Sequence, residues 1–509
     1  MIILLLSACA LSVMAENDLE TYINANTILM FVTNRASFGR DYNKLLGHDA
    51  GTFYPYTTIS DIEQGNTPIV LYSGGLWLGG KVGGQTRVAV AEFSTEYWPG
   101  PMAAGTYIAD AVTNPAYRVY KLYADSTGSN ANTDYTEWPV AQGAPVDNLA
   151  NPLILGDQTL WAVFNDANPA THVATAGSTE PLGIEVRQLT WASAGGDGVD
   201  RIVNYQYALY NRGSNAITDF YASVWIDPDI GGIEDELFGC DTLLDIFYAY
   251  NDGPDAVFGD DPPAVGVRFL YGLMVPSAGD SARFFDHYIS NYRNLDMSAF
   301  RVYLNGADPQ NGDESYNLMK GMTLAGTPLL SGLTFDYPGN PVAATGLLDT
   351  NPGNKHCLGS FGPITFNPGD SQYVCFRIGV GQGTNALSSL TNLKTILSLP
   401  NDLPTDIDEN AGVDNIPECF NLAQNYPNPF NPSTTIEYSL PVASRVNITV
   451  YNVLGRRVKT LLDRPVSAGP HHVVWNGTDR SEHLVSSGIY FYRITAGDFV
   501  RTRKMILLK

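Results

Sequence analysis

The sequence predicts a mainly β protein, with a large β-sandwich-rich body and a small C-terminal β-sandwich. Short runs of β-branched and aromatic residues recur along the chain and are separated by Gly, Pro, Asn and Asp, as strands are separated by turns. The 49 glycines and 29 tyrosines suit many short strands and tight turns. A chain of 509 residues with 44% hydrophobic content is long enough to form more than one core.

Residues 1–15 are predicted to be a signal peptide. Residues 2–14 form an apolar run, and Val13 and Ala15 supply small residues at the positions a signal peptidase recognises. Lipidation of Cys9 is the alternative, but only five residues precede the Leu6–Cys9 segment that would direct it. No later segment reaches the roughly 18 consecutive apolar residues that a membrane helix needs, so no transmembrane span is expected.

The body is predicted to occupy residues 16–400. Its first block contains strand-like runs at 27–33, 69–80 and 86–93. In the second run, Leu76, Trp77 and Leu78 are expected to lie in the core, and the alternative is a platform on which sugar rings stack. The pattern leaves open a division of the body into two subdomains, with a boundary near residues 140–200.

The second half of the body contains the most regular strands. Residues 202–210 alternate apolar and polar side chains, turn through 211–214 and return along 217–226, which predicts a half-buried hairpin. Further strands are expected at 264–274 and 372–380. The spacing of leucines and isoleucine over 387–399 predicts a helix with hydroxyl caps at Ser388 and Ser389 and a stop at Pro400.

An acidic run follows the predicted hairpin. Eleven Asp and Glu residues lie between Asp227 and Asp261, and no Lys or Arg occurs between Arg212 and Arg268. Interleaved apolar residues should hold this run against the core and bring carboxylates together. Hard oxygen ligands without basic partners suit a structural calcium ion. The predicted ligands are Asp227, Asp229, Asp235 and Asp241, and the alternative is a solvated acidic surface.

Catalytic motifs are mostly absent. The sequence contains no Gly-x-Ser-x-Gly elbow, no His-Glu-x-x-His helix and no Gly-Lys-Ser/Thr phosphate loop. No catalytic or cofactor-binding residue is therefore predicted beyond the calcium ligands. A glycosidase needs only two carboxylates about 5 to 10 Å apart, which 52 acidic residues could supply.

Four cysteines remain in the mature chain if the signal peptide is removed: Cys240, Cys357, Cys375 and Cys419. An even number in an oxidising compartment favours at least one disulfide. The pair Cys357–Cys375 is the simplest choice because the two residues flank an expected hairpin. The alternative is that Cys375 is a buried free thiol.

Charge divides the chain into two parts. Residues 401–419 form an acidic linker with Pro and Gly, and the 90 residues after it carry a net charge of +6. The remaining 419 residues carry −29, which argues against nucleic acid or an anionic membrane as a partner of the body.

The last ninety residues are predicted to form a separate domain of two small antiparallel sheets. Pro427, Pro429 and Pro432 impose an extended entry, and short strands are expected at 434–440, 445–452, 472–475, 488–496 and 500–508.

Four motifs in this domain carry a resemblance. They are Asn-Tyr-Pro-Asn-Pro-Phe-Asn-Pro at 425–432, Val-Tyr-Asn-Val-Leu-Gly-Arg-Arg-Val at 450–458, Ala-Gly-Pro-His-His-Val-Val-Trp at 468–475 and Ser-Gly-Ile-Tyr-Phe-Tyr at 487–492. Together they resemble the C-terminal sorting domain of type IX secretion cargo, which implies an immunoglobulin-like fold over 420–509. The resemblance also implies contact with secretion machinery and export, through the periplasm, to the outer cell surface or the medium.

The body also resembles a core found in other proteins with this sorting tail, for which no activity is known. The segments that carry this similarity are 75–81, 227–241 and 263–266. We therefore expect a secreted or surface-displayed, non-catalytic adhesion or structural module that binds a surface glycan or protein. The alternative is an extracellular glycan-acting hydrolase that uses paired carboxylates.

Overall fold

A computed structural model gives the fold. It describes residues 19–400, 407, 408 and 421–507, except 48, 49, 128–130, 148, 285, 286, 330, 331, 423, 424, 426, 427, 429, 431, 441–443, 454, 467, 468, 481, 482 and 498. The expected signal peptide, most of the expected linker, Cys9 and Cys419 lie outside these residues. The chain divides into two compact units, residues 1–139 with 151–407 and residues 140–150 with 408–509.

One face of the body is an eight-stranded antiparallel sheet. Its strand order is β1-β2-β3-β6-β14-β21-β20, and β7 pairs with β6 beside this path. The strands are β1 (Glu20–Ile23), β2 (Met30–Thr33), β3 (Ser37–Gly39), β6 (Ser73–Val82), β7 (Gln85–Ala89), β14 (Ile217–Asp227), β20 (Ala299–Leu304) and β21 (Lys355–Phe366).

The opposite face is a nine-stranded antiparallel sheet. Its order is β15-β16-β17-β22-β13-β12-β11-β8, with β9 pairing with β11. The strands are β8 (Trp98–Pro99), β9 (Tyr120–Tyr123), β11 (Gln158–Asn165), β12 (Ile184–Ala192), β13 (Ile202–Asn211), β15 (Glu236–Asp241), β16 (Ile246–Asn251), β17 (Ala264–Tyr271) and β22 (Ser371–Gly381).

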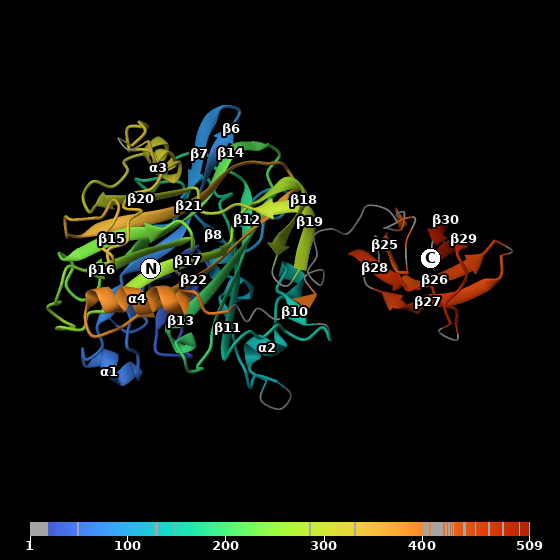
Figure 1. Ribbon diagram of the computed structural model, residues 1–509, viewed down its shortest axis with the longest axis horizontal. Coiled ribbons are helices and arrows are strands. Elements are labelled where there is room, and N and C mark those ends of the chain that lie inside the picture. Colours follow the sequence, from blue (N-terminus) through green and yellow to red (C-terminus); the bar gives the residue numbers. More distant parts are fainter. Residues whose placement is uncertain are drawn as a thin grey trace, which may run out of the picture. The chain divides into compact units, whose positions relative to one another are not determined.

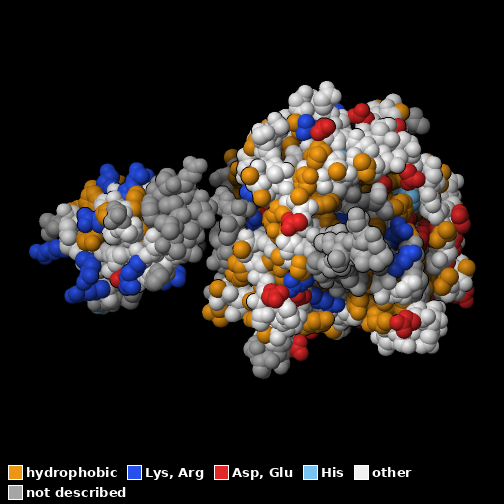
Figure 2. Space-filling view, turned by 180° about the vertical axis from the view of Figure 1, so that it is seen from behind, with side chains coloured by type: hydrophobic (Ala, Val, Ile, Leu, Met, Phe, Trp, Pro, Cys, Tyr) orange, Lys and Arg blue, Asp and Glu red, His pale blue; other side chains and the backbone are white. Residues whose placement is uncertain are grey.

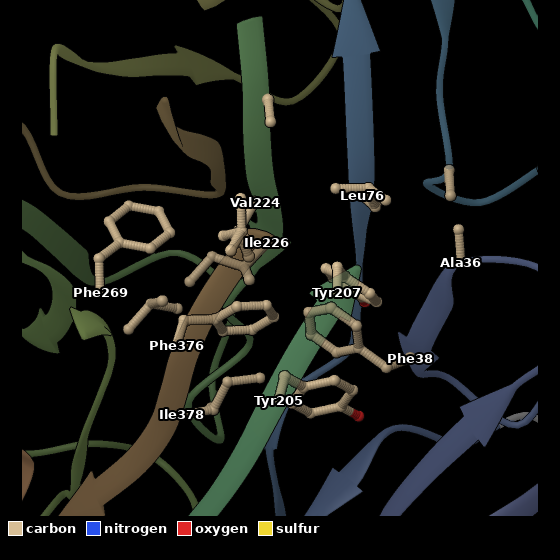
Figure 3. Packing of buried hydrophobic residues seen from close by; sticks show 14 of the residues in the cluster. Ala36, Phe38, Leu76, Tyr205, Tyr207, Val224, Ile226, Phe269, Phe376 and Ile378 are labelled. Carbon is tan, nitrogen blue, oxygen red and sulfur yellow. The ribbon is translucent and has the colours of Figure 1, made fainter. Parts of the chain in front are cut away.

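The core of the body lies between these two sheets. Leu76 and Val224 from the eight-stranded sheet and Tyr205, Tyr207 and Phe376 from the nine-stranded sheet belong to one buried cluster (Figure 3). Tyr205 and Phe376 are stacked, with ring centroids 5.1 Å apart and an interplanar angle of 5°. The prediction of a mainly β protein with a sandwich body is confirmed.

The predicted hairpin over 202–226 is wrong, although both of its strands exist. β13 pairs with β12 and β22, whereas β14 pairs with β6 and β21 in the other sheet. Residues 212–216 therefore carry the chain from one sheet to the other instead of folding it back. Period-two alternation identifies a strand and its inward face, but it does not identify the strand's neighbour.

Four helices accompany the sheets in the described residues: α1 (Ile59–Glu63), α2 (Thr133–Thr136), α3 (Gly312–Met319) and α4 (Ala386–Leu397). α4 confirms the predicted helix, and it lies across the outer face of the nine-stranded sheet (Figure 1). Its cap is Asn385, whose side chain accepts from the Ser388 amide while the Ser388 side chain returns to the Asn385 backbone. Ser389 instead donates to Pro262 O at 2.7 Å.

Smaller elements complete the body. β4 (Thr52–Phe53) pairs with β5 (Ile69–Leu71), and β18 (Met274–Phe284) forms a long hairpin with β19 (His287–Asn294). Short 3-10 helices occur at Ala111–Thr113, Pro115–Tyr117, Val140–Gln142 and Val199–Arg201. β10 (Val146–Asp147) and β23 (Ile407–Asp408) form a separate two-stranded sheet.

The C-terminal unit is a small β-sandwich. Its first sheet has the order β24-β25-β28 and its second the order β27-β26-β29-β30. The strands are β24 (Asn421–Leu422), β25 (Thr434–Leu440), β26 (Ser444–Asn452), β27 (Arg457–Val466), β28 (Gly469–Trp475), β29 (Gly488–Ala496) and β30 (Phe499–Leu507). The five predicted strands are present, and β24 and β27 were not predicted. The two sheets share a buried core of their own.

Hydrogen bonds join the proline-containing segment at 425–432 to β29 and β30, the last two strands of this unit. The amide of Phe430 donates to Ile506 O at 3.0 Å, and the amide of Ile506 donates to Asn428 Oδ1 at 2.8 Å. The amide of Asn425 donates to the Tyr492 hydroxyl at 2.8 Å. The motifs at 425–432 and 487–492, about sixty residues apart, thus meet in the folded unit.

Basic side chains are prominent on the C-terminal β-sandwich in the face shown in Figure 2, in agreement with the net charge of +6 of residues 420–509. Among the described residues, no helix combines the length and the apolar character needed to cross a membrane.

Candidate functional site

The four predicted calcium ligands do not converge. Asp227 is the last residue of β14, and Asp229 follows it in the loop to β15. Asp235 accepts a hydrogen bond of 3.0 Å from Asn251 Nδ2. Asp241, at the end of β15, forms an ion pair of 2.9 Å with Lys394 Nζ on α4. Ile230, Phe238 and Phe247 are buried, so these apolar residues hold the acidic run against the core as expected.

Glu236, rather than Asp235 or Asp241, is the acidic residue that is grouped with Asp227 and Asp229. Its side chain is fully buried, and Glu236 Oε1 accepts a hydrogen bond of 3.1 Å from the Ile230 amide. Asp227 Oδ1 and Glu236 Oε2 are both shielded from solvent and have no hydrogen-bond partner. Asp227, Asp229 and Glu236 thus form a cluster of carboxyl groups, which we call the acidic cluster. No Lys or Arg in the part of the chain that the structure describes forms an ion pair with them.

Burial sets the protonation of the acidic cluster. Burial raises the pKa of Asp227 to about 9, and the neighbouring Asp229 and Glu236 act in the same direction. Burial likewise raises the pKa of Glu236 to about 8 and that of Asp229 to about 6. Charged carboxylates are costly in a low-dielectric interior, so Asp227 and Glu236 retain protons at neutral pH.

His356, on β21, joins the acidic cluster to the surface. His356 Nε2 lies 3.5 Å from Asp227 Oδ1, and His356 Nδ1 lies 2.8 Å from Asp308 Oδ1. The hydrogen bond to His356 lowers the pKa of Asp308. About a third of the Asp308 side chain is exposed, whereas 1% of the His356 side chain is. A line of titratable groups therefore runs from the surface to the interior.

Aromatic rings surround His356. The rings of Phe93, Trp225 and Tyr303 each have a centroid 5.4 Å from that of His356, and Trp225 Nε1 donates to the Tyr303 hydroxyl at 2.7 Å. Trp225 is fully buried, and Phe93 is the exposed member at 38%. This arrangement holds the imidazole in one orientation.

Within the described parts of the chain, no group of three or more His, Cys, Asp or Glu side chains is arranged to hold a metal ion. Calcium therefore remains a prediction that rests on the sequence. Asp227, Glu236 and His356 are also too deeply buried for a sugar to reach them in this conformation.

Sequence reasoning missed Glu236 as a partner of Asp227, and it missed His356 and Asp308 altogether. His356 and Asp308 lie 129 and 81 residues after Asp227 and belong to no local motif. Only the pairing of β14 with β21, in which Ile226 lies opposite Cys357, brings these segments together.

The aromatic segment at 76–78 belongs to the core, as expected. Leu76, Trp77 and Leu78 are fully buried, so the alternative of a sugar-binding platform is wrong. Trp77 stacks on Trp225 with an interplanar angle of 9°, and its Nε1 donates to Ala91 O at 3.1 Å.

The disulfide prediction Cys357–Cys375 is wrong. Cys240, Cys357 and Cys375 are buried free thiols. Cys357 lies on β21 in the eight-stranded sheet and Cys375 on β22 in the nine-stranded sheet, so the residues expected to form one hairpin belong to opposite sheets. Burial raises the pKa of both thiols.

The described residues thus form a large β-sandwich and a separate small β-sandwich. Residues 424–508 match the family model described as the secretion system C-terminal sorting domain. The chain thus carries a type IX sorting tail, which directs it to the secretion machinery and to the cell surface or extracellular space. This confirms the expectation drawn from the four motifs.

No curated protein matches the chain. Similar solved structures include latent PorU from Porphyromonas gingivalis, with 10% identity over 96% of this chain and 32% of that chain and a TM-score of 0.16. PorZ, a surface component of the type IX system of the same organism, shows 11% identity over 96% and 58% with a TM-score of 0.15. A polysaccharide lyase shows 7% identity over 64% and 34% with a TM-score of 0.19. At these TM-scores the similarities carry no argument about the body.

Proposed function

We propose that the body is a non-catalytic adhesion or structural module that the sorting tail delivers to the cell surface or the medium. The observation that carries this proposal is the sorting domain at 424–508, joined to a body whose most perturbed titratable groups are buried. Their burial supports a structural role because a substrate needs access to the groups that react with it.

Deletion of residues 420–509 tests the export half of this proposal. We expect the truncated body to accumulate in the periplasm in folded form, because the hydrophobic core of the body is built without residues from the tail. Cell fractionation with immunoblotting measures its location, and limited proteolysis reports its folding. The full chain, expressed from the same promoter, is the control. Truncated protein that reaches the medium as efficiently as the full chain contradicts the proposal.

A glycan-acting hydrolase is the second candidate. Asp227 and Glu236 are carboxyl groups with raised pKa values, as the acids of many such sites are, and this candidate requires a second conformation in which a sugar reaches them. An assay of reducing ends released from a polysaccharide panel distinguishes the two functions. Activity that Asp227→Asn abolishes, in a variant that remains folded, would support the hydrolase and overturn the non-catalytic module.

The proposal of a structural calcium ion rests on Asp227 and Asp229, since Asp235 and Asp241 have protein partners. A bound ion stabilises the native state by mass action, so calcium is expected to raise the melting temperature of the full chain relative to chelator. Differential scanning fluorimetry at pH 7.5 measures this shift, and Asp229→Ala should remove it. Magnesium is the control ion. Equal melting temperatures with calcium and with chelator would mean that these acids bind no metal.

A further inference from the structure

A pocket of about 300 Å³ lies where edge strands of the two sheets of the body approach each other. Its lining comes from β1, from β9 with the two residues before it, and from the start of α2. Lys121 Nζ on β9 donates to Tyr22 O on β1 at 2.5 Å and thereby connects the two sheets at this point. The lining residues are Glu20, Thr21, Arg118, Val119, Lys121, Tyr123, Asn132 and Asp134.

Lys121 contributes a positive charge with unused donor capacity. An ammonium group has three N–H donors, and the hydrogen bond to Tyr22 O uses one of them. The group lies 4.4 Å from the ring centroid of Tyr22 and 5.6 Å from that of Tyr123. No carboxylate of the described residues lies within ion-pair distance of Lys121. An anion that entered the pocket would therefore find a cation that no protein carboxylate already neutralises.

Arg118 forms the rigid wall of the pocket. Its Nε and Nη2 donate to Asp134 Oδ1 at 3.0 and 2.7 Å, and Nη2 also donates to Glu137 Oε2 at 2.9 Å. The guanidinium group lies 4.1 Å from the ring centroid of Tyr120. These contacts fix the position of a second positive charge beside that of Lys121.

Glu20 does not cancel this charge at neutral pH. Its oxygens accept hydrogen bonds from the amides of Tyr42 and Asn43, and its side chain is buried. Burial raises the pKa of Glu20 to about 8. At pH 7 the carboxylates of Asp134 and Glu137 both pair with Arg118, and Lys121 is left as the cation of the lining without a carboxylate partner among the described residues. Positive charge in the lining is unexpected in this part of the chain, because residues 1–419 carry a net charge of −29.

We propose that this pocket binds an anionic sugar residue, with the carboxylate or sulfate of the sugar on Lys121 and the sugar ring against Tyr123. Tyr123 is 42% exposed, so its ring offers an apolar face to the C–H groups of a pyranose. The hydroxyl of Thr21 is a polar group suited to a sugar hydroxyl, whereas the Asn132 side chain is engaged with Lys121 O and the Tyr135 amide. The inference names a ligand class for the adhesion module and rests on that proposed function.

Titration calorimetry of the full chain tests the site at pH 6.5. The probes are a glucuronate-containing disaccharide, a sulfated disaccharide and a neutral disaccharide of the same size. We expect at least one anionic disaccharide to bind ten or more times as tightly as the neutral one, and the pair of anionic probes shows which group is preferred. Equal affinity for all three probes, or no binding at millimolar concentration, overturns the inference.

Two substitutions locate the binding. Lys121→Met keeps a side chain of similar length and removes the charge, so it should reduce anionic affinity at least tenfold and leave the neutral disaccharide unchanged. Tyr123→Ala should weaken all probes. Lys320→Met is the matched control, because Lys320 also lies over a tyrosine, 5.3 Å from the ring centroid of Tyr316, but outside the pocket. Unchanged affinity in Lys121→Met, with its fold verified by circular dichroism, overturns the inference.

The pH dependence gives an independent readout. Burial lowers the pKa of Lys121 to about 8, and Asp134 partly opposes this effect. Raising the pH from 6.5 to 9 therefore removes the positive charge of Lys121 while Glu20 becomes negative. The other charged or titratable groups near these two are Arg118, Glu137, Tyr22, Tyr123, Arg40 and Asp41. Anionic affinity should fall at least tenfold, and a constant affinity overturns the site. Failure of binding refutes this site alone, whereas failure of export is seen separately by cell fractionation.

Discussion

Raising the pH from 5 to 8 is expected to lower the free energy of unfolding of the chain by about 1.4 kcal/mol per pH unit for each proton that only the native state retains. Asp227 and Glu236, with pKa values raised to about 9 and 8, are two such groups. Between the ordinary pKa near 4 and the raised native value, the native state binds more protons than the unfolded state. Stability therefore falls as the pH rises through this window.

Urea denaturation at pH 5, 6.5 and 8 with chelator present, followed by tryptophan fluorescence, measures this slope. Asp227→Asn removes one of the protons and should reduce the slope by up to about 1.4 kcal/mol per pH unit. Asp260→Asn, at an exposed position of the same acidic run, is the matched control for the loss of a carboxyl group. Stability that rises from pH 5 to 8 would show that the acidic cluster is ionised in the native state.

Trp475→Ala should abolish export. Trp475 is fully buried in the sorting domain, where its ring lies 5.6 Å from that of Phe430 and 5.1 Å from that of Tyr490, measured between centroids. Its Nε1 also donates to Thr478 O at 2.9 Å. Truncation of a buried tryptophan costs about 3–5 kcal/mol, which is comparable with the whole stability of a domain of this size.

The measurement is the fraction of protein outside the cell, together with the protease resistance of the tail and of the body. The tail of the variant should be digested while the body remains resistant. Val474→Ala is the matched control, because Val474 precedes Trp475 on β28 but is 48% exposed. Export of Trp475→Ala at the level of the unsubstituted chain would show that the folded core of the sorting domain is dispensable for delivery.

Strands and helices were predicted correctly where a single local pattern of residues is enough to identify them. The alternation of residues 202–210 gave the strand β13 and its inward residues Tyr205 and Tyr207, because side-chain direction depends only on the backbone period. The spacing of leucines and the following Pro400 gave α4 within two residues of its ends. Its cap was missed, because Asn385 and Ser388 cap the helix jointly and the sequence pattern suggested serines alone.

The candidate site could be predicted only in part. Asp227 and Asp229 were selected because acids without nearby basic residues are conspicuous in a sequence. The partner of Asp241 could not be anticipated, because Lys394 lies 153 residues away and only the packing of α4 on the nine-stranded sheet brings it to Asp241. The pocket around Lys121 has no sequence motif, since it requires two edge strands from different sheets.

Local sequence was sufficient to predict the β class, many of the strands, the sorting tail and the separation of charge between tail and body. These properties depend on composition, on side-chain period and on motifs read along one segment. The tertiary structure alone decided that β13 and β14 lie in opposite sheets, that Cys357 and Cys375 are apart, and that His356 meets Asp227. Each of these depends on which strands become neighbours, and that choice is made by the fit of two sheet faces around one core rather than by any local pattern.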